Sequence, residues 1–137
     1  MIKVLFTVLI SAGLYAQKDE YKLLVSELDS IRHYDQMYRN QLNVISSFYQ
    51  NDTAALNRRL KSHWKLMREQ DSVNLIKVRR IINNYGWLGA DEIGEDGNTT
   101  LFLVIQHADI DSQEKYLPVL QDAVKSGKAS ADQQALL

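Results

Sequence analysis

The sequence contains no glycine and no proline between Gln17 and Tyr85. Because these two residues are the strongest helix breakers, so long a stretch without them favours long α-helices. Within it, positions three and four apart form one stripe in which every member but Asp35 is apolar or aromatic: Leu24, Leu28, Ile31, Asp35, Tyr38, Leu42, Ile45 and Tyr49. This spacing predicts a long amphipathic helix with one buried face.

A second long helix is expected after a short break at Asn51-Asp52-Thr53, where Asp52 or Thr53 can cap its first turn. Apolar residues recur near helical spacing from Leu56 to Ile82. Gly86 is suited to the left-handed conformation at the C-terminus of this helix. Two long helices joined by a short turn form an antiparallel hairpin.

The middle of the chain is rich in turns, since four glycines lie between Gly86 and Gly97. We expect one short helical turn at 90–93 and then a buried helix over about 101–107, capped by Asn98, Thr99 or Thr100. A strand over 99–105 is the alternative. It is less favoured because no second strand-like run exists to pair with it.

The last part of the chain predicts two further helices. One is amphipathic and covers 112–126, with its regular part starting near Pro118, and the other begins at Ser130. We therefore predict an all-α fold, in which a long antiparallel helical hairpin packs with two to three shorter helices. Residues 17–137 form a single domain of this kind.

Residues 1–16 have the features of a secretory signal peptide. Lys3 is followed by a short apolar core, and Ala16 precedes the charged run Lys18-Asp19-Glu20. The apolar run is shorter than the ~20 residues that span a bilayer. We predict cleavage after Ala16, export to the periplasm or the cell exterior, and no stable membrane span after cleavage. An uncleaved anchor or a buried N-terminal helix is the alternative.

Composition excludes several classes of protein. The chain has no cysteine, so it has no disulfide framework, no thiolate metal site and no cysteine nucleophile. Its 16 basic and 17 acidic residues give a net charge of -1. We therefore expect no nucleic-acid partner.

Polar residues interrupt the apolar faces of both long helices. Asp35 lies on the stripe of the first, with Arg39 one turn away, and a buried charge requires a partner, so the two predict an ion pair or the wall of a polar cleft. Asp71 and Asn74 are neighbours on the second helix and can act together on one ligand or cation. His63 is expected to be a half-exposed surface imidazole.

The densest polar cluster is Gln106-His107-Ala108-Asp109, which follows the apolar run 101–105 directly. His107 is a candidate general base, oriented by Asp109 or by an acid from another helix. His107 and Asp109 are also the candidate metal ligands. A favourable position at a helix C-terminus is an equally good explanation of His107. No local signature of a metal, phosphate or dinucleotide site is present.

Several segments together resemble a widespread bacterial family of unknown function, over roughly residues 30–137: Tyr85-Gly86-Trp87, Gly94, Gln106-His107-Ala108-Asp109, Tyr116-Leu117-Pro118, Gly127 and Ala135-Leu136-Leu137. Leu88 stands where members carry proline, and the Asp-Arg pair that members carry after Leu137 is absent, so we expect the natural protein to continue. The resemblance implies that the shared polar residues meet in one pocket: Asp35, Arg39, Asp71, Asn74, Gln106, His107 and Asp109. Tyr85 and Trp87 are expected to wall it.

Three functions remain open at this level. The leading one is a non-enzymatic exported module that binds a small ligand or an envelope protein through the polar pocket, with no cofactor. The first alternative is a hydrolase in which His107 works with Asp109, Asp71 or Asp35, with or without a divalent metal. The second is a structural homodimer that buries the Leu24–Ile45 face against its copy.

Overall fold

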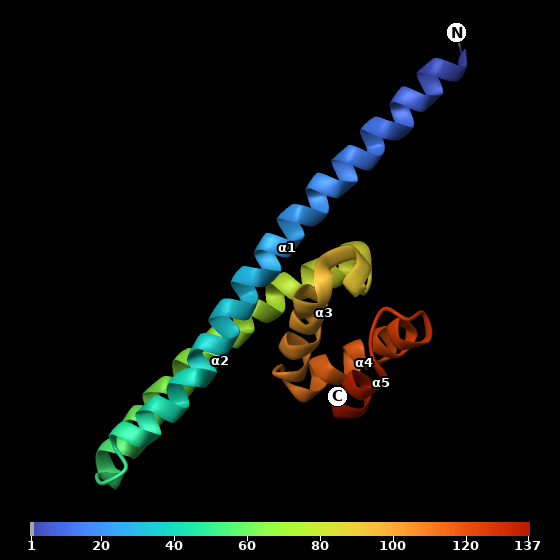
Figure 1. Ribbon diagram of the computed structural model, residues 1–137. Coiled ribbons are helices and arrows are strands. Elements are labelled where there is room, and N and C mark those ends of the chain that lie inside the picture. Colours follow the sequence, from blue (N-terminus) through green and yellow to red (C-terminus); the bar gives the residue numbers. More distant parts are fainter. Residues whose placement is uncertain (1) are drawn as a thin grey trace.

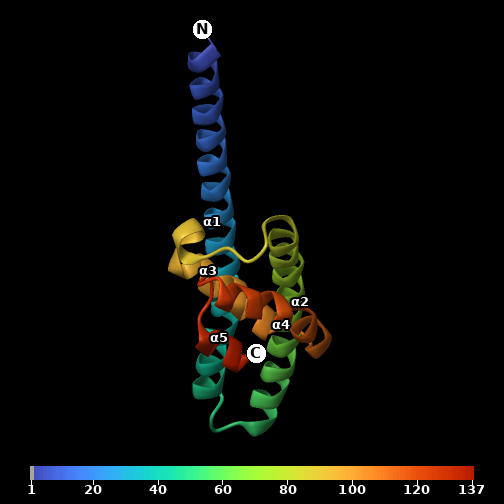
Figure 2. The ribbon, with the colours of Figure 1, turned by 90° about the vertical axis from the view of Figure 1, so that its right-hand side faces the viewer.

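The computed structural model describes the backbone of residues 2–137 and the side chains of residues 19–137. Its helices are α1 (Ile2–Phe48), α2 (Thr53–Tyr85), α3 (Ala90–Gln106), α4 (Ile110–Lys125) and α5 (Ala131–Leu136). Helices α1 and α2 form the antiparallel hairpin, and α3 to α5 gather on one side of it (Figures 1 and 2). All regular structure in the described backbone is helical, so the all-α prediction is confirmed.

The predicted signal peptide covers residues 1–16, whose side chains lie outside the described part of the chain. For the residues that are described, no helix has the length and apolar character needed to cross a membrane.

Both ends of α2 lie where the sequence predicts. The Asp52 side chain accepts a hydrogen bond from the Ala55 N–H at 2.9 Å and caps the first turn. Gly86 ends the helix as predicted, but its φ of +72° and ψ of −168° lie outside the predicted left-handed helical region, in a conformation that suits glycine alone. Its N–H donates to the Ile82 carbonyl. These two residues fix the hairpin turn and the exit from the hairpin.

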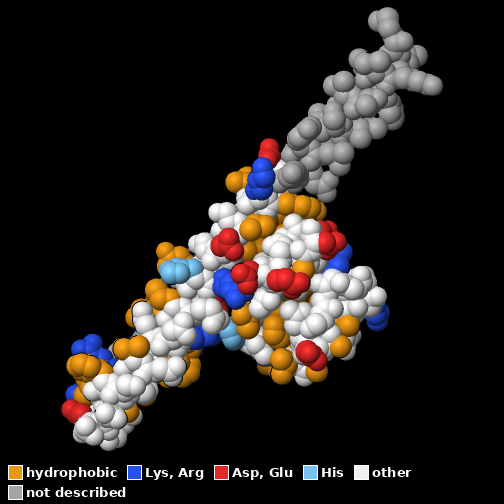
Figure 3. Space-filling view, viewed as in Figure 1, with side chains coloured by type: hydrophobic (Ala, Val, Ile, Leu, Met, Phe, Trp, Pro, Cys, Tyr) orange, Lys and Arg blue, Asp and Glu red, His pale blue; other side chains and the backbone are white. Residues whose placement is uncertain are grey.

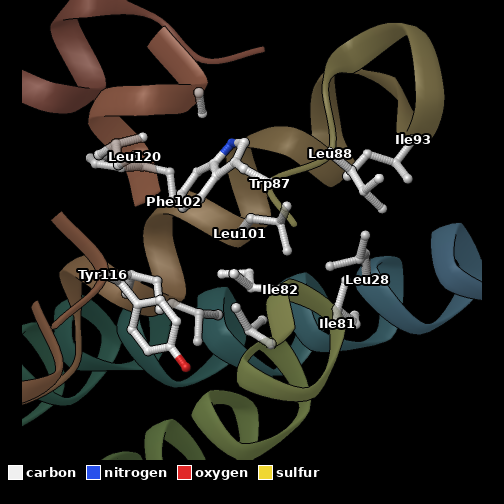
Figure 4. Close-up of a cluster of buried hydrophobic side chains, with 14 of the residues drawn as sticks. Leu28, Ile81, Ile82, Trp87, Leu88, Ile93, Leu101, Phe102, Tyr116 and Leu120 are labelled. Carbon is white, nitrogen blue, oxygen red and sulfur yellow. The ribbon is translucent and has the colours of Figure 1, made fainter. Parts of the chain in front are cut away.

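The hydrophobic core lies where α3 covers the hairpin and continues between α3 and α4; it includes Leu28 of α1, Ile81 of α2, Leu101 of α3 and Leu120 of α4 (Figure 4). These four side chains are fully buried. Towards the hairpin turn only α1 and α2 remain, because α3 to α5 do not extend that far (Figure 1). The second half of the predicted stripe is therefore only half-buried: Tyr38, Leu42, Ile45 and Tyr49.

Helix α3 starts earlier than predicted. A first turn at 90–93 and the following helix are one element with a kink at Gly94, where φ is +76°. The prediction that Asn98, Thr99 or Thr100 caps this helix is wrong, because all three lie inside it and Gly89 is at the N-cap. The buried Asn98 amide donates instead to the carbonyls of Leu88 and Lys128, both at 2.7 Å. Asn98 thus ties the loops before α3 and before α5 to each other.

Helix α4 also starts earlier than predicted, at Ile110 rather than near Pro118. The Asp109 side chain caps it by accepting from the Ser112 N–H at 2.8 Å. Pro118 is exposed inside the helix, while Tyr116 and Leu120 on either side of it are buried. Burial of this face keeps the helix continuous through the proline, which lacks an N–H to donate.

Candidate functional site

Asp35 is the centre of the polar cluster, on α1 beside the C-terminal end of α3. Its side chain is only 2% exposed. Its Oδ1 lies 3.0 Å from Nδ1 of His107 and 3.0 Å from a guanidinium nitrogen of Arg39. Its Oδ2 accepts a hydrogen bond from the Gln36 amide at 2.7 Å. A buried carboxylate is tolerated here because both of its oxygens have partners.

These partners keep Asp35 ionised. Burial alone raises the pKa of a carboxyl group, but the hydrogen bond from His107, the charge that His107 carries when protonated, and the positive charge of Arg39 together outweigh it, helped by the Gln36 amide. The pKa of Asp35 therefore lies below its ordinary value. A carboxylate only accepts hydrogen bonds, so Nδ1 of His107 must carry the proton.

The other ring nitrogen of His107 is left available. In neutral imidazole with a proton on Nδ1, Nε2 holds a lone pair. Nε2 has no hydrogen-bond partner among the residues that the structure describes. The His107 side chain is 22% exposed, so solvent can reach the ring. Asp35 thus fixes the tautomer of a histidine at the edge of the core.

Arg39 joins the cluster to α2. Its guanidinium contacts Asp71 through three hydrogen bonds of 3.0–3.2 Å, in addition to Asp35. One of its nitrogens also donates to the Asp35 carbonyl at 3.0 Å. Two carboxylates around one guanidinium carry a net charge of about -1 when His107 is neutral.

The turn that holds His107 is clamped by a side chain that sequence reasoning missed. Gln113, in the first turns of α4, donates its amide to the carbonyls of Gln106 and Ala108, at 2.8 and 3.0 Å. These carbonyls stand at the end of α3, where helical partners are lacking. The sequence signal is a glutamine seven residues after Gln106, close enough to fold back on the turn.

Three side chains of the cluster are of the types that bind divalent metals. Ligand atoms of Asp35, Asp71 and His107 lie within 4.8 Å of one another. The Arg39 guanidinium, however, already contacts both carboxylates and supplies the positive charge between them. A metal ion would have to displace it. Asp109, the other predicted metal ligand, points its carboxylate at the start of α4 instead.

The comparisons with known proteins agree with the resemblance seen in the sequence. The model of a Family of unknown function (DUF6624) matches residues 27–137. The chain belongs to this family. No curated protein matches the DUF6624 chain, and no solved structure matches it.

Asn74, another predicted residue of this DUF6624 chain, lies one turn along α2 from Asp71. It is buried, and its Oδ1 accepts from the Gln70 amide at 2.9 Å. Its Nδ2 is buried without a hydrogen-bond partner in the described part of the chain. A buried donor without an acceptor is costly unless water or a ligand completes it.

Four predicted residues are used elsewhere in the described structure. The Tyr85 hydroxyl donates to Glu20, and the Trp87 ring packs in the core near Phe102 (Figure 4). The Gln106 amide approaches the Leu136 carbonyl at 3.5 Å. Asp109 caps α4, and hydrogen bonds from the Ser112 N–H and hydroxyl hold the pKa of its carboxyl below the ordinary value.

His63 corrects another expectation. The prediction of a half-exposed imidazole is wrong, because the His63 side chain is buried between α2 and α1. Its Nε2 lies 2.6 Å from the Tyr38 carbonyl, and the two rings are 5.7 Å apart. A carbonyl only accepts, so Nε2 carries the proton. His63 is a structural link within the hairpin.

Proposed function

We propose that this DUF6624 protein is a hydrolase in which His107 acts as a general base and Asp35 orients it. The observation that carries the proposal is the 3.0 Å contact between Nδ1 of His107 and the buried Asp35 carboxylate, with Nε2 unpartnered in the described structure. A buried carboxylate behind a histidine fixes its tautomer and stabilises the imidazolium that forms when it takes a proton.

In the proposed reaction, Nε2 accepts a proton from a water molecule while the water oxygen attacks the electrophilic centre of an ester, amide or phosphoester. The imidazolium then returns that proton to the leaving group. Asp35 stays ionised throughout, since its pKa is held below the ordinary value. Gln113 and Arg39 are positioning residues, which hold the turn of His107 and the carboxylate behind it.

Two other readings of the site have less support. A metal-dependent hydrolase would require Arg39 to leave both carboxylates. A structural homodimer would bury the face from Leu24 to Ile45 against its copy, yet Leu24, Leu28 and Ile31 are already buried within the chain itself.

Binding of a polar ligand without turnover is the second candidate. It is supported by the buried Nδ2 of Asn74, which lacks an acceptor among the described residues and lies one turn from Asp71. An oxygen atom of a ligand would satisfy this donor. The two candidates differ in what they require of His107. The hydrolase needs an unprotonated Nε2, and binding alone does not.

The hydrolysis of p-nitrophenyl acetate and bis(p-nitrophenyl) phosphate tests the proposal, since both release a coloured product. We expect His107→Gln to lower the rate by roughly 100- to 10,000-fold, the usual contribution of a general base. The matched control is His33→Gln, because His33 is exposed on α1 and outside the cluster. A wild-type rate equal to that of buffer, or equal rates for the wild type and His107→Gln, would overturn the proposal.

We also propose that the protein is exported and cleaved after Ala16. The support is the order of Lys3, the apolar core and the charged run after Ala16. N-terminal sequencing of the protein recovered from the extracytoplasmic fraction of a bacterial host should begin at Gln17. A chain that keeps Met1 and stays in the cytosol would contradict the proposal.

A further inference from the structure

The net charge of -1 conceals two regions of opposite charge. Residues 53–68, the first half of α2, contain five bases and no acid: Arg58, Arg59, Lys61, Lys65 and Arg68. Residues 87–137 contain nine acidic and three basic residues. In Figure 3, acidic side chains lie over α3 to α5 together with a few basic ones, and most of the charged side chains at the free end of the hairpin are Lys or Arg.

Four of the bases follow one line along α2. Arg58, Lys61, Lys65 and Arg68 are spaced by three and four residues, so they share one side of the helix. All four are exposed. Only Lys65 has an ion-pair partner in the part of the chain that the structure describes, Glu69 at 3.8 Å. The Glu69 carboxylate offsets one of these four positive charges, so this side of the helix keeps an excess of positive charge.

Exposed aliphatic side chains continue on the outward side of the same helix. Leu66 is 49%, Val73 45% and Ile76 68% exposed. They follow one another at spacings of seven and three, and lie on the side of α2 opposite to the buried Met67, Asn74 and Val78. We call this surface, from Arg58 to Ile76, the outer face of α2. It combines cations with aliphatic groups, contains one acid, Glu69, and has no partner within the described structure.

We propose that the outer face of α2 docks on the headgroups of an anionic lipid surface. The cations would meet lipid phosphates, while the aliphatic side chains would enter the boundary between headgroups and acyl chains. Nucleic acid would use the cations but offers no apolar layer for Leu66, Val73 and Ile76. The opposite side of α2 packs on α1, so the helix is already formed and can lie flat on a surface.

Partition into lipid vesicles tests this proposal with the full chain. Vesicles of neutral phosphatidylcholine are compared with vesicles that contain 30% phosphatidylglycerol, by co-sedimentation at low salt. We expect stronger partition into the anionic vesicles, and a loss of that preference of roughly 30-fold in Lys61→Gln/Lys65→Gln, from two lost cations. Residues 1–16, which include Lys3, are the same in every variant, so the comparison between variants removes their effect.

Two further variants separate a docking face from a general charge effect. Lys115→Gln/Lys125→Gln removes two exposed cations from α4 and should keep the wild-type preference. Ile76→Ser should weaken partition into anionic vesicles while leaving the binding of soluble polyphosphate unchanged. Equal losses in the two double variants would overturn the proposal. So would a wild-type chain without preference for anionic vesicles, or an Ile76→Ser variant that partitions like the wild type, which would indicate a site for a soluble polyanion.

Discussion

The substitution Asp35→Ala tests whether the cluster holds the helices together. It removes the carboxylate that Arg39, Gln36 and His107 share. Removing one member of a buried ion pair costs about 3–5 kcal/mol, because the other charge stays buried without its partner. Arg39 keeps its hydrogen bonds to Asp71, and His107 is partly exposed. We therefore expect the lower end of this range, about 3 kcal/mol.

Urea denaturation followed by circular dichroism at 222 nm measures this loss in the free energy of unfolding. An unfolding entropy of about 2.1 cal/mol/K per residue converts it to a fall in melting temperature of about 10 °C. The matched control is Asp29→Ala, an exposed aspartate on the same helix without an ion-pair partner in the described structure. It should cost less than about 0.5 kcal/mol. Similar small losses for both variants would refute the idea that Asp35 anchors the cluster.

Three other predictions follow from the same structure. Because the pKa of Asp35 is lower in the folded state than in the unfolded state, its contribution to stability is complete above about pH 4 and is lost as the pH falls through the folded value. The free energy of unfolding, measured by urea titration, should therefore fall more between pH 6 and pH 3 for the wild type than for Asp35→Asn. Equal falls would contradict a lowered pKa for Asp35. Gly94→Ala should cost about 1–3 kcal/mol, since φ of +76° and ψ of 163° suit only glycine, whereas the exposed neighbour change Glu95→Ala should cost little. Addition of Zn²⁺ should leave the melting temperature unchanged because Arg39 occupies the place between the carboxylates, and a rise that His107→Ala abolishes would show a metal site instead.

The long helices could be predicted because their signals are local. The stretch without glycine or proline predicts long helices, and the Asp52 cap and Gly86 act within one turn of the chain. The structure begins α2 after Asp52 and ends it at Gly86, as expected. Helix α3 was harder, because Asn98 has the residue type of a cap but is used to bond two distant loops. The start of α4 was misjudged for a similar reason, since burial of its inner face outweighs the local effect of Pro118.

The site was predictable only in part. A buried charge needs an opposite charge or hydrogen bonds beside it, and this general rule predicted the ion pair of Asp35 and Arg39. The way in which α3 crosses α1 decides which acid approaches His107. The sequence alone did not decide among Asp109, Asp71 and Asp35. Asp109 is nearest in sequence but is used as the cap of α4. Trp87 was misassigned because an aromatic residue next to a turn suits a pocket wall and a core equally well.

The ring of His107 allows the most direct test of the central claim, that Asp35 holds His107 with a proton on Nδ1 and a free lone pair on Nε2. Long-range ¹H–¹⁵N NMR spectra of the imidazole at pH 7.5 distinguish the two tautomers. We predict the Nδ1–H tautomer in the wild type and its partial loss in Asp35→Asn. A wild-type spectrum of the Nε2–H tautomer, or a tautomer that Asp35→Asn leaves unchanged, would contradict the account.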